Sequence, residues 1–431
     1  MPAKRLFLSV VLLVVPLAAP AQSPDTTGPP PAVRAAFDSI VTANTYHPTL
    51  DDGTLRGEGA QWLVERGQEA HHFMIGERHG TAEIPAVAGA LYERLKPVGY
   101  DYAALEIGPF AARRVNAALD RGGFEALASV LTGYEAAPVA FLDWREEARL
   151  AARVHEAGGT IWGLDQEFSS SLPMHLDALS EQAETETERT AVEEMRTRMR
   201  TEWTEEQDYL GNASPDALRK LRRAFAERGD ETALSRIDAL IKSNAIYAPY
   251  TRDTGSFYHS GVDRENYMKR VLLDHLRRAH PATGASPKVF YKFGGLHSGR
   301  HPGATLDPRV PLGTFVAEWA RTVKGQDSFH LFVDCNGGTR KGSGQGAAGG
   351  CPSALTAPAR AKGKASPFSA HLSDDRVTLI DLTALRDRFG DWSFLTDRAQ
   401  ASIMAFDAYL AVPDVTPATP IDRSEPSTGN D

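Results

Sequence analysis

The sequence predicts an α/β fold in which a central, mostly parallel β-sheet is flanked by helices. Short, nearly continuous apolar runs alternate with amphipathic helical stretches along most of the 431-residue chain. Apolar residues at consecutive positions are typical of parallel strands, because helices cover both faces of such a sheet. Repeated strand–helix–strand units favour right-handed crossovers between neighbouring strands. Residues 173–250 lack strand signals, which indicates a helical insertion in this sheet.

The first residues have the layout of a secretory signal peptide. Lys4 and Arg5 precede an apolar run at residues 6–17, and small residues at 19–21 offer a cleavage site before Gln22. This run is shorter than the ~18 residues that a spanning helix needs. An N-terminal membrane anchor is the alternative interpretation. We expect residues 1–21 to be removed and the mature protein to be secreted or periplasmic, without a transmembrane segment.

Composition divides the rest of the chain into three parts. Residues 22–50 form a Pro-rich linker and a lead-in helix, and residues 51–415 carry the strand and helix patterns of one α/β domain. Residues 416–431 are polar and contain several prolines. Because such segments bury little apolar surface, we expect this tail to be disordered.

Seven apolar stretches are predicted to form the strands of the sheet. Helical stretches lie between them, such as residues 84–99 and 144–159, and each ends at glycine, as helices commonly do. Apolar residues at helical spacing within the insertion indicate a helical pair packed on the domain, and a lid over the site is the alternative. The predicted strands are residues 72–76, 102–108, 160–165, 288–294, 329–334, 377–382 and 408–412.

Charge and cysteine content limit the partners and the compartment. The net charge is -9 and no basic stripe is present, which argues against nucleic acid as a partner. The two cysteines, Cys335 and Cys351, flank a Gly-rich loop. In an oxidising compartment we expect them to form a disulfide that closes this loop. Zinc binding is the rival use of two thiols, but their spacing fits no zinc pattern.

Chemically capable side chains follow three of the predicted strands. Glu77 and His79 follow the strand at 72–76, Glu106 closes the strand at 102–106, and His297 follows the strand at 288–293. Ligands of open α/β sheets bind at the carboxyl ends of the strands, and neighbouring glycines let the chain turn sharply there. The sequence therefore predicts one site that gathers two imidazoles and two carboxylates.

Two kinds of chemistry suit this set of residues. An imidazole beside carboxylates can take a proton from water near neutral pH as a general base. Alternatively, His79, Glu106 and His297 are suitable ligands for a divalent metal, Zn or Mn, that keeps an open position for water. The sequence contains no G-x-S-x-G elbow, no H-E-x-x-H helix and no GxxxxGK[ST] phosphate loop.

Three further residues are candidates for substrate binding. Arg264, early in the helical stretch "YHSGVDRENYMKRVLLDHL", is placed to orient an anionic group or to form a surface ion pair. Asp165 ends the strand "TIWGLD" and either joins the site or caps the next helix. Arg78 lies between Glu77 and His79.

In order along the chain, "GERHGTAEIP", "YAALEIG", "WGLD", "DRENYM" and "YKFGGLH" resemble motifs of the erythromycin esterase-like proteins. That family belongs to a wider group that includes haem-binding uptake proteins and Tiki-type metallopeptidases. The resemblance implies a mostly parallel sheet with a helical insertion and a cleft that holds the motif residues. Within the carried-over motifs, His79 looks like the base that activates water, Glu106 is the second-motif carboxylate, His297 is the late histidine, and Arg264 matches the motif arginine.

One spacing departs from the esterase pattern. Only Arg78 separates Glu77 from His79, where the esterases usually have two residues, and this spacing is nearer the haem-uptake branch and the metal-dependent relatives. We expect a hydrolase that acts on an ester or amide of a small molecule or peptide. In it His79 activates water, Glu106 fixes the imidazole or shares a metal, and His297 stabilises the oxyanion. The alternative is a protein that binds haem or another small ligand without turnover.

Overall fold

The computed structural model describes residues 29–202, 209–251, 257–279, 286–300, 309–342, 349–356 and 366–422. The predicted signal peptide, residues 1–21, lies outside this part of the chain.

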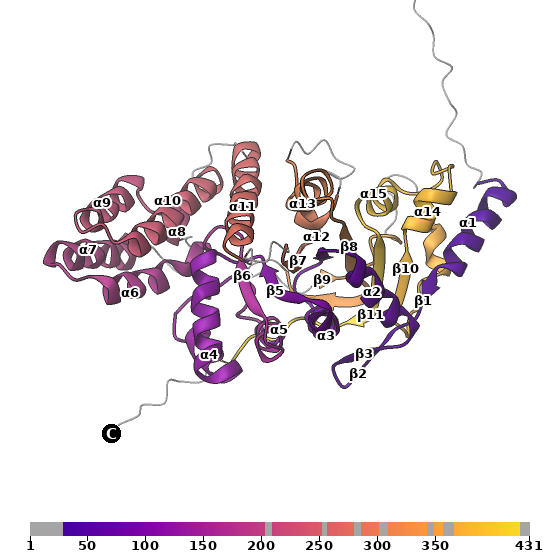
Figure 1. The fold of residues 1–431 in the computed structure, drawn as a ribbon, viewed down its shortest axis with the longest axis horizontal. Coiled ribbons are helices and arrows are strands. Elements are labelled where there is room, and N and C mark those ends of the chain that lie inside the picture. Colours follow the sequence, from indigo (N-terminus) through magenta and orange to yellow (C-terminus); the bar gives the residue numbers. More distant parts are fainter. Residues whose placement is uncertain are drawn as a thin grey trace, which may run out of the picture.

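A central sheet with the strand order β1-β10-β11-β8-β4-β7-β5-β6 organises the molecule, and β9 pairs with β8 (Figure 1). The strands from β11 to β6 are parallel to one another. β10 runs antiparallel to β11, and β1 at the edge of the sheet runs antiparallel to β10. The predicted α/β fold with a mostly parallel sheet is confirmed. The sheet contains β1 (Thr45–Tyr46), β4 (His72–Glu77), β5 (Tyr100–Leu105), β6 (Thr160–Gly163), β7 (Lys288–Gly294), β8 (Ser328–Arg340), β9 (Gly349–Gly350), β10 (Thr378–Asp381) and β11 (Ala408–Val415), and a separate hairpin contains β2 (Thr49–Asp51) and β3 (Thr54–Arg56).

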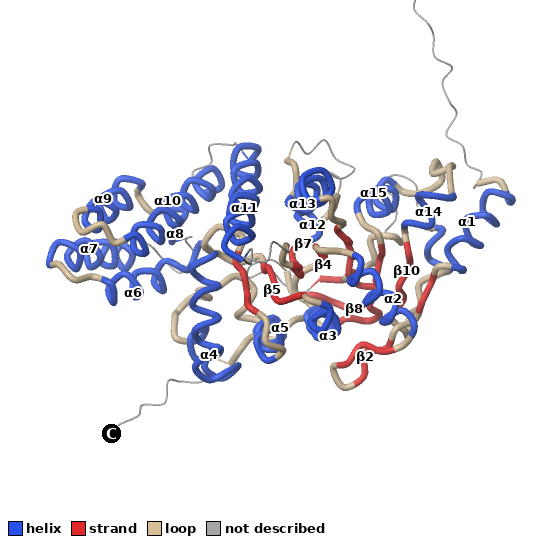
Figure 2. The backbone as a smooth tube through the Cα atoms, in the orientation of Figure 1, coloured by secondary structure: helices blue, strands red, loops and turns tan. Residues whose placement is uncertain are grey.

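Helices cover both faces of the sheet (Figure 2). Alternate side chains of β4 show why: Phe73 and Ile75 pack in one apolar cluster, while Met74 packs in another on the opposite face. The first face is covered by α2 (Glu58–Glu69), α3 (Glu83–Leu95), α4 (Pro109–Thr132) and α5 (Arg145–Glu156). The second face is covered by α11 (Phe257–Ala279), α12 (Gly295–Ser298) and α13 (Leu312–Trp319), and beside them by α1 (Pro31–Ala43), α14 (Thr383–Arg388) and α15 (Asp397–Ala405).

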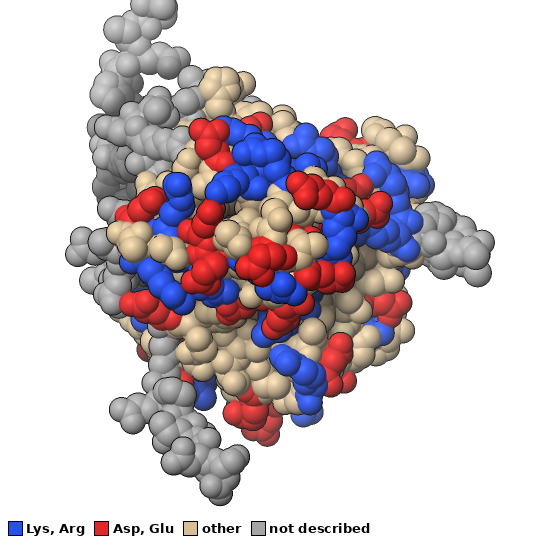
Figure 3. Space-filling view, turned by 90° about the vertical axis from the view of Figure 1, so that its left-hand side faces the viewer, with Lys and Arg blue, Asp and Glu red and all other residues tan. Residues whose placement is uncertain are grey.

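The predicted helical insertion forms its own apolar cluster at one end of the molecule (Figure 1). Val192, Met195 and Leu210, three of the apolar residues at helical spacing, are buried in this cluster. Trp203, another residue with this spacing, lies outside the described residues. Figure 3 faces this end and shows positive and negative side chains interspersed rather than a basic stripe. Its helices are α6 (Leu172–Gln182), α7 (Glu186–Glu202), α8 (Tyr209–Asn212), α9 (Pro215–Ala226) and α10 (Glu231–Thr251).

Residues 416–422, here called the C-terminal strap, fold onto the domain, so the expectation of a disordered tail from residue 416 is wrong for this part. Backbone N–H groups of Ala82 and Arg145 donate to the carbonyls of Thr416 and Thr419, at 2.9 and 2.7 Å. The Ile421 side chain is buried. Polar, Pro-containing composition did not reveal these contacts, because the backbone and not the side chains supplies most of them. Residues 423–431 lie outside the described part of the chain.

The predicted lead-in segment also belongs to the domain. Phe37 and Val41 of α1 are fully buried, and β1 adds a strand to the sheet beside β10. A disulfide joins Cys335 at the end of the buried part of β8 to Cys351, at a Cα–Cα distance of 5.7 Å. None of the helices in the described ranges is long and apolar enough to cross a membrane.

Candidate functional site

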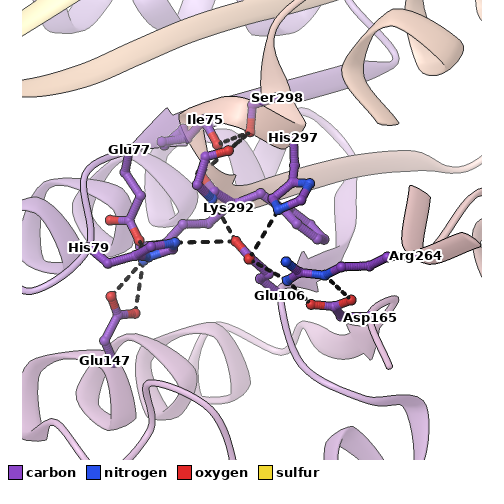
Figure 4. A network of polar contacts seen from close by, with 12 residues as sticks. Ile75, Glu77, His79, Glu106, Glu147, Asp165, Arg264, Lys292, His297 and Ser298 are labelled. Atoms are coloured by element: carbon purple, nitrogen blue, oxygen red, sulfur yellow. Dashed lines mark hydrogen bonds and ion pairs between the residues drawn. The ribbon is translucent and has the colours of Figure 1, made fainter. Parts of the chain in front are cut away.

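The predicted site residues meet at the carboxyl ends of three adjacent strands. β7 lies between β4 and β5 in the sheet, and Gly294 of β7 pairs with Glu77 of β4. Because all three strands are parallel, the segments that follow them emerge at the same edge. Glu77, His79, Glu106 and His297 therefore gather there (Figure 4), although the chain separates the first from the last by more than two hundred residues.

Glu106 is the centre of this cluster. Its Oε2 accepts a hydrogen bond from the backbone N–H of Gly294 at 2.7 Å, and its Oε1 lies 2.8 Å from Nη2 of Arg264. A Cβ at position 294 would lie 2.8 Å from Nε2 of His79, so only glycine lets the backbone approach this closely. Burial raises the pKa of Glu106, but the charges of His297 in its protonated form, of His79 and of Arg264 outweigh burial and hold the pKa well below its usual value. Glu106 therefore stays ionised.

His79 lies between two carboxylates. Its Nδ1 is 2.7 Å from Oε1 of Glu77, and its Nε2 is 3.4 Å from Oε2 of Glu106. Burial lowers the pKa of His79, but Glu106 and Glu77 outweigh it and raise the pKa to about 10. His79 is thus an imidazolium at neutral pH.

The turn that follows His79 is sharp. Gly80 has φ +95°, and a Cβ there would lie 2.3 Å from the carbonyl oxygen of Lys341. The left-handed conformation and the close approach both require glycine. On the other side, the ring of Phe141 stacks on the His79 imidazole. The imidazole is consequently fixed in position and direction.

His297 has its own carboxylate partner. Its Nδ1 is 2.7 Å from Oε1 of Glu265, and Oε2 of Glu265 accepts a hydrogen bond from the backbone N–H of Leu312 at 2.8 Å. The Nε2 atom of His297 lies 3.5 Å from Oε1 of Glu106. Since Glu265 holds Nδ1, Nε2 is the ring nitrogen of His297 that remains for a water molecule or a substrate.

Arg264 and Asp165 lie at the site but are bound to each other. Arg264 Nε donates to Asp165 Oδ1 at 3.0 Å, and its Nη2 contacts both Asp165 and Glu106. Asp165 Oδ1 also accepts from the backbone N–H of Gln166 at 2.8 Å. Asp165 therefore joins the site. The alternative that it caps the next helix is wrong, because Gln166 is not helical and Phe168 is the N-cap of the short helix that follows.

Arg78 points away from the cluster. Its Nε lies 2.7 Å from Oδ1 of Asp334, a fully buried residue of β8. Asp334 Oδ2 accepts from the backbone N–H of Ala354 at 2.7 Å and from the hydroxyl of Tyr409. Consecutive residues alternate in direction as the chain leaves a strand, so Arg78 cannot share the direction of Glu77 and His79.

Two buried residues that the sequence did not single out support Glu77. Lys292 of β7 contacts Glu77 Oε1 and lies 2.7 Å from Oε1 of Glu147 on α5. Burial raises the pKa of Glu147, and despite the opposing effect of Lys292 it reaches about 7. The available signal was Lys292 itself, the charged residue inside the apolar run "VFYKFG", because a cation buried in a strand needs an anionic partner.

The arrangement does not fit a divalent metal. Within the described ranges, no group of three or more His, Cys, Asp or Glu side chains is arranged to hold a metal ion. Both oxygens of Glu106 already face donors, and Arg264 supplies a cation in direct contact with this carboxylate. A metal ion bound to Glu106 would have to displace these partners.

No protein-family model and no curated protein matches this sequence. Solved structures nevertheless share its fold. A succinoglycan biosynthesis protein has a TM-score of 0.59 at 15% identity, over 91% of this chain and 100% of its own. A mutant of erythromycin esterase EreC in its open conformation has a TM-score of 0.57 at 16% identity, over 88% and 99% of the two chains. A protein from Bacillus cereus has a TM-score of 0.55 at 14% identity, over 90% and 99%. The chain therefore has the fold of the erythromycin esterase-like proteins that its sequence motifs resemble.

Proposed function

We propose that this protein is an exported hydrolase of carboxylic esters or amides. One observation carries the proposal: two histidines, each oriented by its own glutamate, direct their Nε2 atoms at the two oxygens of the same buried carboxylate. The distances to Glu106 are 3.4 Å for His79 and 3.5 Å for His297. Both exceed an ordinary hydrogen bond, so a water molecule or a substrate oxygen can compete for either nitrogen.

The charge of His79 changes the role that we expected for it. A group whose pKa is about 10 already holds its proton at neutral pH and cannot take another from water. Its Nε2–H is instead a positively charged donor for the oxygen of a carbonyl group. Such a donor stabilises the oxyanion that forms when water attacks the carbonyl carbon.

His297 is the residue that we assign as the base. Its Nδ1 hydrogen bond to Glu265 leaves Nε2 as the acceptor. In the first step Nε2 takes a proton from water, and the hydroxide adds to the carbonyl carbon. In the second step the tetrahedral intermediate collapses, and His297 returns the proton to the leaving alcohol or amine. The products are a carboxylic acid and that alcohol or amine.

Glu106 stabilises the charge that appears on His297. It remains ionised beside both imidazoles, and Arg264 and the Gly294 N–H hold it in place. A fixed negative charge next to Nε2 favours the imidazolium that exists only after water has lost its proton. Glu106 thus contributes electrostatically and exchanges no proton.

Export is part of the proposal and rests on two features. The N-terminal sequence has the signal-peptide layout, and the Cys335–Cys351 disulfide suits an oxidising compartment. Mass spectrometry of the secreted or periplasmic protein tests export, because cleavage as proposed leaves Gln22 as the first residue.

The enzymatic proposal is tested by a panel of carboxylic esters and amides assayed at pH 7. Wild type should hydrolyse at least one of them, and His79→Gln and His297→Gln should each lower kcat by a factor of about 10² or more. His155→Gln is the matched control, since His155 pairs with Asp120 on the surface, and it should retain full activity. A wild-type protein that cleaves nothing but gives a Soret band on haem titration would replace the enzyme with the haem-binding alternative.

A further inference from the structure

A cavity of about 250 Å³ lies beside the cluster, and Glu77 is one of its lining residues. It is bounded by α12, β8 and one face of α15. Its walls are mostly apolar and include Leu296, Phe332, Ala405 and Phe406. Leu296 is 73% exposed, so a ligand that covers it removes apolar surface from water. The volume is below the roughly 300 Å³ at which drug-sized pockets begin, so the cavity suits one part of a ligand.

Three charged side chains line this cavity, and two of them are neutralised within the protein. Glu77 contacts Lys292 and His79, and Arg78 pairs with Asp334. The third, Arg398 on α15, forms no ion pair or hydrogen bond through its guanidinium group with any residue in the described ranges. Within the described part of the chain, Arg398 is therefore the charged side chain of this cavity that has no ionic partner in direct contact.

The surroundings of Arg398 favour an anion at this point. Burial lowers the pKa of Arg398, and the neighbouring Arg78 lowers it further, while Asp334 and Tyr409 act in the opposite direction. Arg398 is an exposed residue, so its guanidinium group is open to an incoming anion. A planar carboxylate matches the geometry of a guanidinium group, with two parallel N–H···O bonds.

We propose that this cavity is a subsite for a short, apolar carboxylate group, whose anion pairs with Arg398 while its carbon chain lies on Phe332, Phe406 and Leu296. If the cavity serves the proposed hydrolase, its substrate is an ester or amide whose acyl chain carries a free carboxylate in addition to the carbonyl group that is attacked. That extension rests on the proposed function, whereas binding of the carboxylate does not. Glu77 borders both the cavity and the His79 imidazole, so a group seated here adjoins the proposed reaction centre.

The first test is calorimetric titration of the full-length mature protein with hexanoate, with 1-hexanol as the neutral probe and acetate as the anion without an apolar chain. Hexanoate should bind wild type more tightly than either of the other two. Arg398→Gln should weaken hexanoate binding by about ten- to a hundredfold and leave 1-hexanol unchanged. Arg398→Lys keeps the charge and should retain part of the affinity.

Arg388→Gln is the matched control, because Arg388 is exposed at the end of α14 and does not line the cavity. It should bind hexanoate as wild type does. Equal affinity of Arg398→Gln and wild type, or no hexanoate binding by wild type, would overturn the proposal. A fall in the unfolding temperature of Arg398→Gln is separated from loss of the anion contact by the retained 1-hexanol binding.

The second test compares hydrolysis of mono-p-nitrophenyl succinate and p-nitrophenyl butyrate. Wild type should prefer the succinate ester, and Arg398→Gln should lose this preference through a higher KM rather than a lower kcat. If neither ester is hydrolysed while hexanoate binding depends on Arg398, the proposed function fails and the subsite stands. If both are hydrolysed equally well by wild type and by Arg398→Gln, the hydrolase stands and the subsite fails.

Discussion

The phenyl ring of Phe141 lies parallel to the imidazole of His79, with 4.1 Å between ring centroids and 14° between the planes. Phe141 has φ +64°, in the left-handed region that residues other than glycine rarely adopt. The C-terminal strap holds this segment, since the N–H of Ile421 donates to the carbonyl of Asp143 at 2.8 Å. The strap thereby keeps a strained aromatic residue against the His79 imidazolium, for which we propose the role of stabilising the oxyanion.

The positive φ of residue 141 should reverse the usual order of stability of glycine and alanine variants. In ordinary positions glycine is less favourable than alanine by roughly 0.5–1 kcal/mol, but a positive φ strains alanine and not glycine. Phe141→Gly should therefore be as stable as Phe141→Ala or more stable, by up to about 1 kcal/mol in the free energy of unfolding. Urea denaturation of the two variants measures this difference. A clearly more stable alanine variant would show that residue 141 has an ordinary conformation.

The charge of His79 predicts a pH dependence of stability. Its pKa rises from the usual 6.5 to about 10 in the folded protein, so protonation favours the folded state. This contribution is fully present below pH 6.5 and is lost as the pH rises towards 10. Between these values the free energy of unfolding should fall more steeply for wild type than for His79→Gln. Parallel curves for the two proteins would mean that His79 is not charged.

Removal of Arg264 should be costly because it takes the contacting cation from the buried carboxylate of Asp165 and one of the neighbouring cations from Glu106. The side chains of Glu106 and Asp165 are each 6% exposed. Arg264→Leu should lower the free energy of unfolding by about 3 kcal/mol. Asp165→Asn in the same chain removes the negative charge that has lost its partner and should restore part of the loss, which a double-mutant cycle in urea quantifies. If the effects of the two substitutions simply add, Arg264 and Asp165 are not coupled.

The C-terminal strap should be needed for both stability and activity. A chain that ends at Val415 loses the hydrogen bonds to the segments of Ala82 and Arg145, and should be destabilised by about 3 kcal/mol or more. Its hydrolytic activity should fall further than its folded fraction, because the loops of His79 and Phe141 lose their common support. The matched control ends at Asp422, keeps the whole strap and should resemble wild type in thermal unfolding and in activity.

The disulfide should stabilise the protein measurably. It closes a loop across a sequence separation of 16 residues, for which chain entropy gives about 3 kcal/mol. Addition of a reductant should lower the unfolding temperature of wild type. The double variant Cys335→Ala, Cys351→Ala should already unfold at the lower temperature and should not respond to the reductant. If the reductant also lowered the unfolding temperature of the double variant, its effect would not arise from this disulfide.

Local patterns in the sequence predicted the parts of the site that depend on single strands. Apolar runs located β4, β5 and β7, and the rule that parallel strands end at one edge then gathered Glu77, Glu106 and His297. The direction of a side chain also follows a local rule. Arg78 points to the opposite side from its neighbours Glu77 and His79, and it therefore reaches Asp334.

What the sequence did not reveal depends on contacts between distant segments. The position of β7 between β4 and β5 places Lys292 against Glu77 and Glu147, and no pattern within one strand encodes this pairing. The charge of His79 likewise results from two carboxylates of different segments, Glu77 at the end of β4 and Glu106 directly after β5. The antiparallel strand β10, which lies between β1 and β11, resembles the parallel strands in composition because helices cover it as well.

The strap also couples segments that are far apart in the sequence. The N–H of Ala82 donates to the carbonyl of Thr416, the N–H of Arg145 donates to the carbonyl of Thr419, and the N–H of Ile421 donates to the carbonyl of Asp143. A displacement of the strap would therefore move the turn after His79 and the segment of Phe141 together, so that two sides of the same imidazole respond to one peripheral element.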